Sequence, residues 1–139
     1  MTDIAKLPPS RELLEAAMKT SPFTTWIGTE LLHFEPGQVE IAANLRSEMT
    51  QHHGFAHGAV VGYMADTVCA WAAASVAGDV VTAEYKLNLL APAVGQRLYA
   101  TGSVIKAGKA QVVTRADVFA EHQGTKKIVA TALATIVRV

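Results

Sequence analysis

An uninterrupted apolar segment from Gly58 to Gly78 constrains what this chain can fold into more than any other feature. It reads GAVVGYMADTVCAWAAASVAG, and Asp66 is the only charged residue within it. Its apolar residues fall on every side of a helix, so such a helix must be surrounded. The alanine-rich composition and the carboxylate near the middle favour the core helix of a globular domain over a membrane span. The rest of the chain must therefore supply a wall around this helix.

Strand-like runs dominate the rest of the sequence, and turn residues separate them roughly every 12 residues, which favours antiparallel pairing. A hairpin is predicted over residues 29–45, with Pro36-Gly37 at the centre of a type II turn. Four further strands are predicted over residues 80–90, 97–106, 110–120 and 127–139. A short amphipathic helix with Ser10 as N-cap is predicted at about 10–20. We therefore expect residues 1–139 to form a single α+β domain, a curved antiparallel sheet wrapped around one long buried central helix.

The strand predicted over residues 80–90, VVTAEYKLNLL, alternates apolar and polar residues. Strict alternation puts Val81, Tyr85 and Leu89 on one face. It puts Thr82 and Lys86 on the opposite face.

Charge and cysteine content limit the partners and the compartment. Lysine plus arginine total 12, as do aspartate plus glutamate, so the formal net charge is zero. Because there is no basic run or stripe, nucleic acid is not expected as a partner. The N-terminal residues lack the apolar core of a signal peptide, and the single cysteine, Cys69, fits a reducing compartment. We expect a cytoplasmic protein without a membrane partner, and the low charged fraction of 17% suggests that it hides surface in a copy of itself.

The stretch GFAHGAVVGYMAD places a helix start shortly before the buried carboxylate of Asp66. Amides at the start of a helix have no intrahelical acceptor and lie at the positive end of its dipole, so those of Gly58, Ala59 and Val60 could polarise a carbonyl. Asp66 has no cation among its helical neighbours and could act as a general base or a nucleophile. Together these two elements could polarise a carbonyl and either activate water or attack the carbonyl carbon directly.

Gly58 and Asp66 are eight residues apart, which is about 12 Å along a helix. One carbonyl cannot contact both groups on the same helix. If both act on one substrate, they come from two chains whose central helices run antiparallel about a two-fold axis. The spacing then predicts a dimer with two shared sites.

Two longer stretches, QHHGFAHGAVVGYMADTVCAWAA and VVTAEYKLNLLAPAVGQRLYATGSVIKAGKA, carry a family resemblance over about residues 23–139. The HG pair, the carboxylate nine residues after its histidine, the NLLAPA turn and the KAGK turn resemble those of the hotdog-fold acyl-CoA thioesterases of the phenylacetate-pathway and 4-hydroxybenzoyl-CoA thioesterase type. One departure is Ala59, where the family usually has a second glycine. The resemblance implies a hotdog fold, hydrolysis of acyl-CoA, no cofactor other than the coenzyme A of the substrate, and a homodimer or homotetramer.

The resemblance also implies roles for residues outside the central helix. Gln51 would orient the thioester carbonyl or the attacking water, and Thr82 would lie near that water. His57 would either take part in catalysis directly or fix the start of the helix. Coenzyme A would bind at Leu90 and at the turn formed by Lys106, Ala107, Gly108 and Lys109. The alternative for these positions is an ordinary turn, loop or sheet-surface residue.

Two other functions stay open. A hydratase or dehydratase of the same fold would use a histidine together with the carboxylate, and His52 stands fourteen residues before Asp66. The other is a non-catalytic acyl-CoA binding protein. A serine hydrolase is excluded because the sequence has no G-x-S-x-G elbow. No metal is expected, because the spacing of the histidines fits no standard zinc site.

The residue types do not identify the acyl group of the substrate. Aryl, arylacetyl and medium-chain acyl groups are all compatible with the sequence. The walls of the acyl pocket are expected to come from strand residues of two chains and from Phe55, Val61, Tyr63 and Met64.

Overall fold

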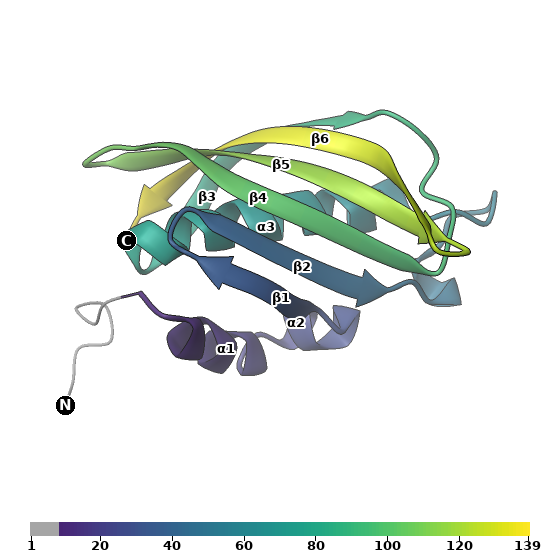
Figure 1. The fold of residues 1–139 in the computed structure, drawn as a ribbon, viewed down its shortest axis with the longest axis horizontal. Helices are drawn as coiled ribbons and strands as arrows, with labels where there is room; N and C mark the ends of the chain where they lie inside the picture. Colours follow the sequence, from purple (N-terminus) through teal and green to yellow (C-terminus); the bar gives the residue numbers. More distant parts are fainter. Residues whose placement is uncertain (1–8) are drawn as a thin grey trace.

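The computed structural model describes residues 9–139, and its main feature is a six-stranded antiparallel sheet curved around one helix (Figure 1). The order of strands in the sheet is β1-β2-β4-β5-β6-β3. The strands are β1 (Glu30–Glu35), β2 (Gln38–Asn44), β3 (Val80–Leu89), β4 (Arg97–Ala107), β5 (Gln111–His122) and β6 (Thr125–Arg138). The helix is α3 (Gly58–Ala77). The architecture expected from the sequence is confirmed.

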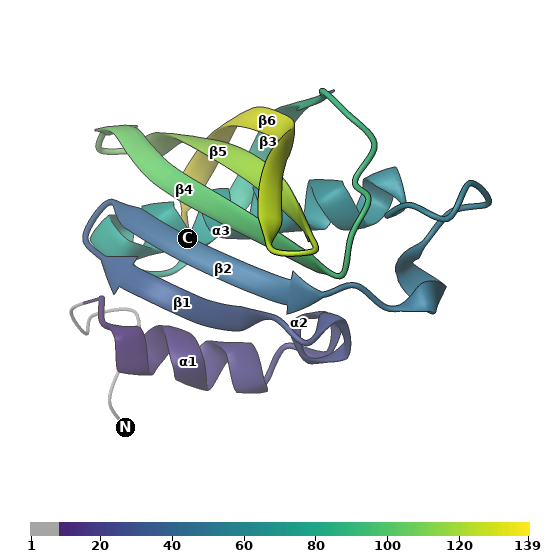
Figure 2. The same ribbon diagram turned by 45° about the vertical axis from the view of Figure 1, so that its right-hand side comes forward.

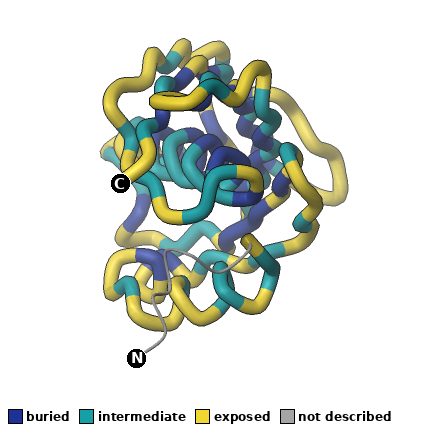
Figure 3. Tube along the Cα trace, turned by 90° about the vertical axis from the view of Figure 1, so that its left-hand side faces the viewer, coloured by how far each residue is buried: buried dark blue, intermediate teal, exposed yellow. Residues whose placement is uncertain are grey.

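The concave face of the sheet packs closely against α3 because both surfaces carry small side chains. Several buried residues of the inner face are alanines: Ala100, Ala116, Ala132 and Ala134. Gly102 in β4 marks the closest approach, since a Cβ there would stand 2.5 Å from the carbonyl oxygen of Val68. In Figure 3 the buried residues gather around the central helix. α3 is long and apolar enough to cross a membrane, but its contacts with β2, β3, β4, β5 and β6 make it the core helix of the domain.

Two helices precede the sheet and lie outside β1 (Figure 2). α1 (Arg11–Lys19) begins at Ser10, whose hydroxyl accepts a hydrogen bond from the N–H of Leu13 at 3.2 Å. No residue of α1 is buried. α2 (Pro22–Ile27), which sequence reasoning missed, ends at Gly28 in the left-handed conformation with φ 78°. A 3₁₀ turn, η2 (Ser47–Met49), leads into the loop before α3.

β3 lies at an edge of the sheet and contains one irregularity. Its pairing with β6 advances from Thr82 opposite Ile136 to Glu84 opposite Thr135, so Ala83 is an extra residue that forms a β-bulge. A one-residue insertion reverses the side-chain alternation on either side of it.

The bulge changes which β3 residues face the helix. Thr82 and Tyr85 both lie inward, each opposite a fully buried residue of β6, whereas Val81 lies on the outer face and is 51% exposed. The predicted alternation, which placed Val81 with Tyr85 and opposite to Thr82, is therefore wrong. As a result, Thr82 faces α3.

Candidate functional site

The start of α3 leaves one backbone amide without an acceptor. His57 is the N-cap, and its ring Nδ1 accepts a hydrogen bond from the N–H of Ala59 at 3.0 Å. The carbonyl oxygen of His57 accepts from the N–H of Val60 at 2.9 Å. Among residues 9–139, the N–H of Gly58 has no acceptor. The expectation that three amides face a substrate is thus corrected to one, and His57 fixes the start of the helix.

Asp66 is half-buried on α3 and is held by one hydroxyl. Its Oδ1 accepts a hydrogen bond from Oγ1 of Thr82 at 2.7 Å. Its Oδ2 has no hydrogen-bond partner, and no cation pairs with the carboxylate, anywhere in the described part of the chain. This arrangement fixes the orientation of the carboxylate and leaves one oxygen to accept a proton or to attack a carbonyl carbon.

Gly58, Gly62 and Asp66 follow one another at four-residue spacing and face β3. A Cβ at Gly58 would stand 3.5 Å from Cδ1 of Leu89, and a Cβ at Gly62 would stand 3.2 Å from the hydroxyl of Tyr85. The free amide and the carboxylate therefore share one side of α3, but they are two helical turns, about 12 Å, apart. One chain carries both components of a site without bringing them together.

The loop before α3 does not reach the carboxylate of its own chain. The side-chain oxygen of Gln51 accepts a hydrogen bond from the N–H of His53. His52 and His53 are exposed, and their ring centroids are 4.0 Å apart. Within residues 9–139, no hydrogen bond joins these side chains to Asp66. The pairing of His52 with Asp66 that a hydratase would need is not formed within one chain.

The lysine turn lies at the opposite end of α3 from Gly58. Lys106 and Lys109 are exposed, and Arg138 of β6 donates to the carbonyl oxygens of Gly108 at 3.1 Å and of Ala77 at 3.2 Å. Ala77 is the last residue of α3, so the turn stands roughly 28 Å along the helix axis from the free amide. Arg138 adds a third positive charge, and sequence reasoning missed it because only the folded sheet brings β6 to this turn.

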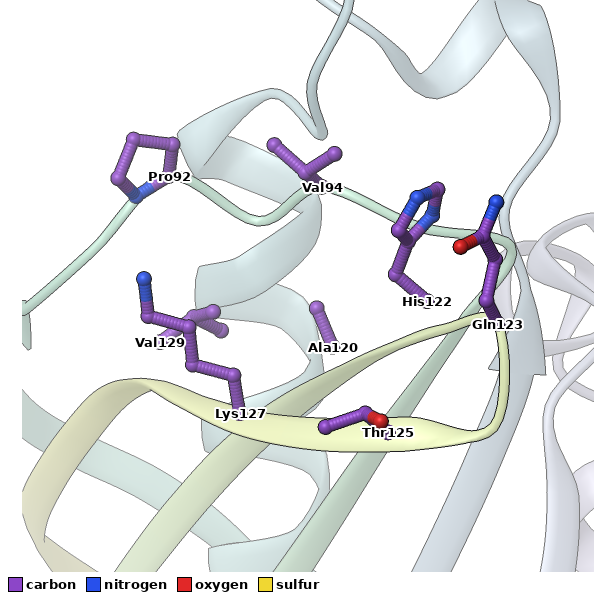
Figure 4. Close-up of a pocket in the computed structure, with 8 residues that line it drawn as sticks. All are labelled: Pro92, Val94, Ala120, His122, Gln123, Thr125, Lys127 and Val129. Carbon is purple, nitrogen blue, oxygen red and sulfur yellow. The ribbon is translucent and has the colours of Figure 1, made fainter.

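A pocket of about 490 Å³ lies between the loop after β3 and the β5–β6 turn (Figure 4). Pro92 and Val94 face it from the loop, and His122 and Lys127 face it from the hairpin. Leu90 adjoins the pocket, since its N–H donates to the carbonyl oxygen of Val129, a lining residue, at 2.8 Å. Leu90 therefore lies beside a pocket whose wall combines apolar residues with His122 and Lys127.

Two of the residues expected to line an acyl pocket lie in the core instead. Val61 and Met64 are 2% and 0% exposed, because they point from α3 into the sheet. Tyr63 is half-buried, and its hydroxyl is 2.7 Å from Oγ1 of Thr29. The prediction for Val61 and Met64 is wrong. A second cavity, of about 370 Å³, lies instead between α1 and α3.

Cys69 is a free cysteine buried in the core. Burial raises the pKa of its thiol to about 11, and the nearby charge of Asp66 contributes in the same direction. At neutral pH this thiol is therefore protonated and is not a nucleophile.

The sequence matches the thioesterase superfamily over residues 53–127. A thioesterase family protein from Silicibacter pomeroyi is 31% identical over 89% of this chain and 93% of that chain, with a TM-score of 0.87. The phenylacetic acid degradation protein PaaI from Thermus thermophilus is 26% identical over 86% of this chain and 100% of that chain, with a TM-score of 0.75. The PaaI protein of the phenylacetic acid degradation operon of E. coli, 22% identical over 91% of this chain and 90% of that chain, has the same fold with a TM-score of 0.82. No curated protein matches the sequence. The expected hotdog fold is confirmed, and the chain belongs to the thioesterase superfamily.

Proposed function

We propose that the protein hydrolyses acyl-CoA thioesters at sites shared by two chains. The observation that carries this proposal is the placement of two groups on one side of α3. Gly58 has a free N–H at the helix start, and the carboxylate of Asp66, oriented by Thr82, lies about 12 Å further along the helix. In an antiparallel pair of helices, the amide of one chain meets the carboxylate of the other.

Each group has a defined part in the reaction. The thioester carbonyl oxygen accepts a hydrogen bond from the N–H of Gly58, which stabilises the negative charge that develops on this oxygen. Asp66 of the second chain takes a proton from water, or attacks the carbonyl carbon itself and is freed by water in a second step. In both routes a C–O bond forms, the C–S bond breaks, and the thiolate of coenzyme A leaves and is protonated. By donating to Oδ1 of Asp66, Thr82 keeps Oδ2, the reacting oxygen, directed at the carbonyl carbon.

The edge strand β3 supports the pairing of two chains. It lies next to the stripe of Gly58, Gly62 and Asp66, and on its free side it has no partner strand among the described residues. Tyr85 and Leu89 on its inner face are 41% and 59% exposed in the single chain, more than such side chains usually are in a finished sheet. A second copy placed along β3 would cover them and would complete both sites. The apolar residues exposed on the outer face of the sheet are available for pairing such dimers into tetramers.

In the bound substrate, the coenzyme A moiety is proposed to extend from the thioester carbonyl along Leu90 of the chain that supplies Gly58. Leu90 adjoins the pocket with Lys127 in its wall, and a lysine pairs with phosphate as a point charge. The turn of Lys106 and Lys109 is too far along α3 to serve the same chain's Gly58, so the turn that contacts the phosphates comes from another copy.

An acyl-CoA panel with detection of released thiol tests the activity. We expect thiol release by the wild-type protein and a fall in kcat of at least about 100-fold in Asp66→Asn, because the amide can neither accept the proton nor attack. Glu40→Gln, at an exposed glutamate of β2, is the matched control and should keep full activity. Near-normal hydrolysis by folded Asp66→Asn would refute the role of Asp66. Loss of enoyl-CoA absorbance without thiol release would identify a hydratase, and binding without either change would identify an acyl-CoA binding protein.

Mixing two inactive variants tests whether the site is shared. Asp66→Asn lacks the carboxylate, and Gly58→Pro lacks the amide hydrogen. In a heterodimer, one shared site carries both substitutions and the other carries neither. Co-refolding should therefore restore about half of the wild-type activity per heterodimer. If verified heterodimers stay inactive, both groups act within one chain and the shared site is ruled out.

A further inference from the structure

The cavity between α1 and α3 has apolar walls and is not used by the chemistry proposed above. Its volume is about 370 Å³, within the range of ligand pockets. The helices contribute Leu13, Leu14 and Ala17 from α1 and Ala70, Trp71 and Ala74 from α3. No residue of α1 is buried, so this amphipathic helix covers the cavity and its side chains do not fill it.

The cavity begins about one turn of α3 beyond the carboxylate of Asp66. Along α3, Ala70 and Ala74 follow Asp66 at four-residue steps and so lie one and two turns further on, about 6 and 12 Å along the axis. Along β3, Thr82 and Val80 are successive inward-facing residues. Thr82 contacts Asp66, and Val80 lines the cavity. A group attached to a carbonyl at Asp66 therefore enters the cavity without crossing another element.

The charge of the walls restricts the occupant. Asp79 is the only charged residue that lines the cavity within the described chain, and it lies with Gly78 beyond the end of α3. Because no cation lines the cavity there, a carboxylate or phosphate would lose its hydration without compensation and would meet a like charge. A neutral hydrocarbon, by contrast, gains free energy from burial against these side chains.

We infer that this cavity holds the acyl group of the substrate and is built for an unbranched chain of medium length. This inference rests on the proposed function, because it takes the carbonyl to lie at Asp66. With bonds of about 1.5 Å and angles near 111°, an extended hydrocarbon advances about 1.25 Å per carbon. Reaching Ala74, about 12 Å from Asp66, takes roughly eight to ten carbons. The chain that supplies Asp66 binds the acyl group, and the chain that supplies Gly58 binds the start of the coenzyme.

Two neighbouring alanines of α1 provide a test with a matched control. Ala17 lines the cavity and Ala16 does not, and both are exposed residues of a helix with no buried side chain. Ala17→Phe should lower kcat/KM for decanoyl-CoA at least tenfold. It should leave butyryl-CoA within about twofold, because a butyryl chain reaches only about 4 Å and stops short of Ala70. Ala16→Phe should leave both values unchanged. Equal profiles for the two variants would overturn the inference while leaving the hydrolase intact, whereas absence of hydrolysis by the wild type would refute the proposed function.

A binding measurement decides the inference even without catalysis. In the Trp26→Phe background, Trp71 in the cavity wall is the only tryptophan. Titration with 1-decanol should change its fluorescence saturably, 1-butanol at the same concentrations should not, and Ala17→Phe should abolish the change. If decanol leaves Trp71 fluorescence unchanged, or if Ala17→Phe responds like Ala16→Phe, the cavity does not hold the acyl chain.

Discussion

Replacing Gly58 by proline puts the ring Cδ in place of the amide hydrogen, and the backbone around it suits the change. Proline is favoured at the first position of a helix because its fixed φ fits and the missing N–H has no intrahelical partner. The residue before a proline must be extended, and His57 already is, with φ −60° and ψ 139°. The hydrogen bonds of His57 with Ala59 and Val60 do not involve the lost N–H. The variant is therefore expected to fold with the wild-type helix.

The expected loss follows from the count of free donors. Gly58 has the one amide in the first turn of α3 without an acceptor in the described chain, so no neighbouring amide can replace it. Loss of one oxyanion donor lowers kcat by about 10² to 10³, or about 2.7–4 kcal/mol. Gly58→Ala is the control, because it keeps the N–H and its Cβ would meet Cδ1 of Leu89 at an ordinary contact distance of 3.5 Å.

Steady-state kinetics with the best acyl-CoA of the panel should be measured for both variants, together with thermal unfolding followed by circular dichroism. We expect Gly58→Ala to stay within about threefold of wild type and Gly58→Pro to lose activity at an unchanged melting temperature. Equal kcat values for folded Gly58→Pro and Gly58→Ala would mean that the helix start does not polarise the carbonyl, and the proposed mechanism would fail.

Three further predictions concern other parts of the molecule. Thr82→Val should lower kcat about 10- to 100-fold, because a hydroxyl bond to a charged acceptor is worth about 1.5–3 kcal/mol. Thr82→Ser keeps the hydroxyl and should retain activity. Equal kinetics in the two variants would show that the 2.7 Å bond to Asp66 does not serve the reaction. Replacing Lys106 and Lys109 by alanine should raise KM for acyl-CoA more than it lowers kcat, and less so in high salt; a pantetheine thioester without phosphates should be unaffected. Cys69, whose thiol pKa is raised by burial from 9.0 to about 11, ionises first in the unfolded chain, so the free energy of unfolding should fall as pH rises above about 9, by on the order of 2 kcal/mol at pH 11. Between pH 8 and pH 10.5, the free energy of unfolding measured in urea should fall less for Cys69→Ala than for the wild type. An equal fall in the two proteins would contradict this.

The parts of the fold that the sequence predicts are those decided by local pattern. The span of α3 follows from its apolar residues on every side and from Gly78, which ends it with φ 82°. The turn at Gly37, with φ 83°, joins β1 and β2 where Pro36-Gly37 predicts it. The position of Asp66 relative to Gly58 follows from helix geometry, because eight residues of any α-helix span about 12 Å.

The parts that escaped prediction depend on contacts distant in sequence. α2 has six residues, too few to be stable alone, and it is held by packing, with Thr24 and Ile27 buried. The bulge at Ala83 has no sequence signal, because the run VVTAEYKLNLL alternates cleanly and only pairing with β6 creates the extra residue. The cavity under α1 is equally invisible in the sequence, since its walls come from four separate elements.

The place of β3 in the sheet has a consequence for the order in which the protein is made. β3 follows α3 in the chain but pairs with β6, the last strand, and Thr82 lies opposite Ile136, 54 residues later. At about 5–20 residues per second, a ribosome needs about 3–10 s to make that interval. During this time β3 has no strand to pair with, so nothing in the sheet holds Thr82 inward. The carboxylate of Asp66 therefore acquires its hydroxyl partner only after the last strand has left the ribosome. A nascent chain stalled before β6 leaves β3 unpaired and open to chaperones and proteases, and its Asp66 lacks the hydroxyl bond that orients the carboxylate.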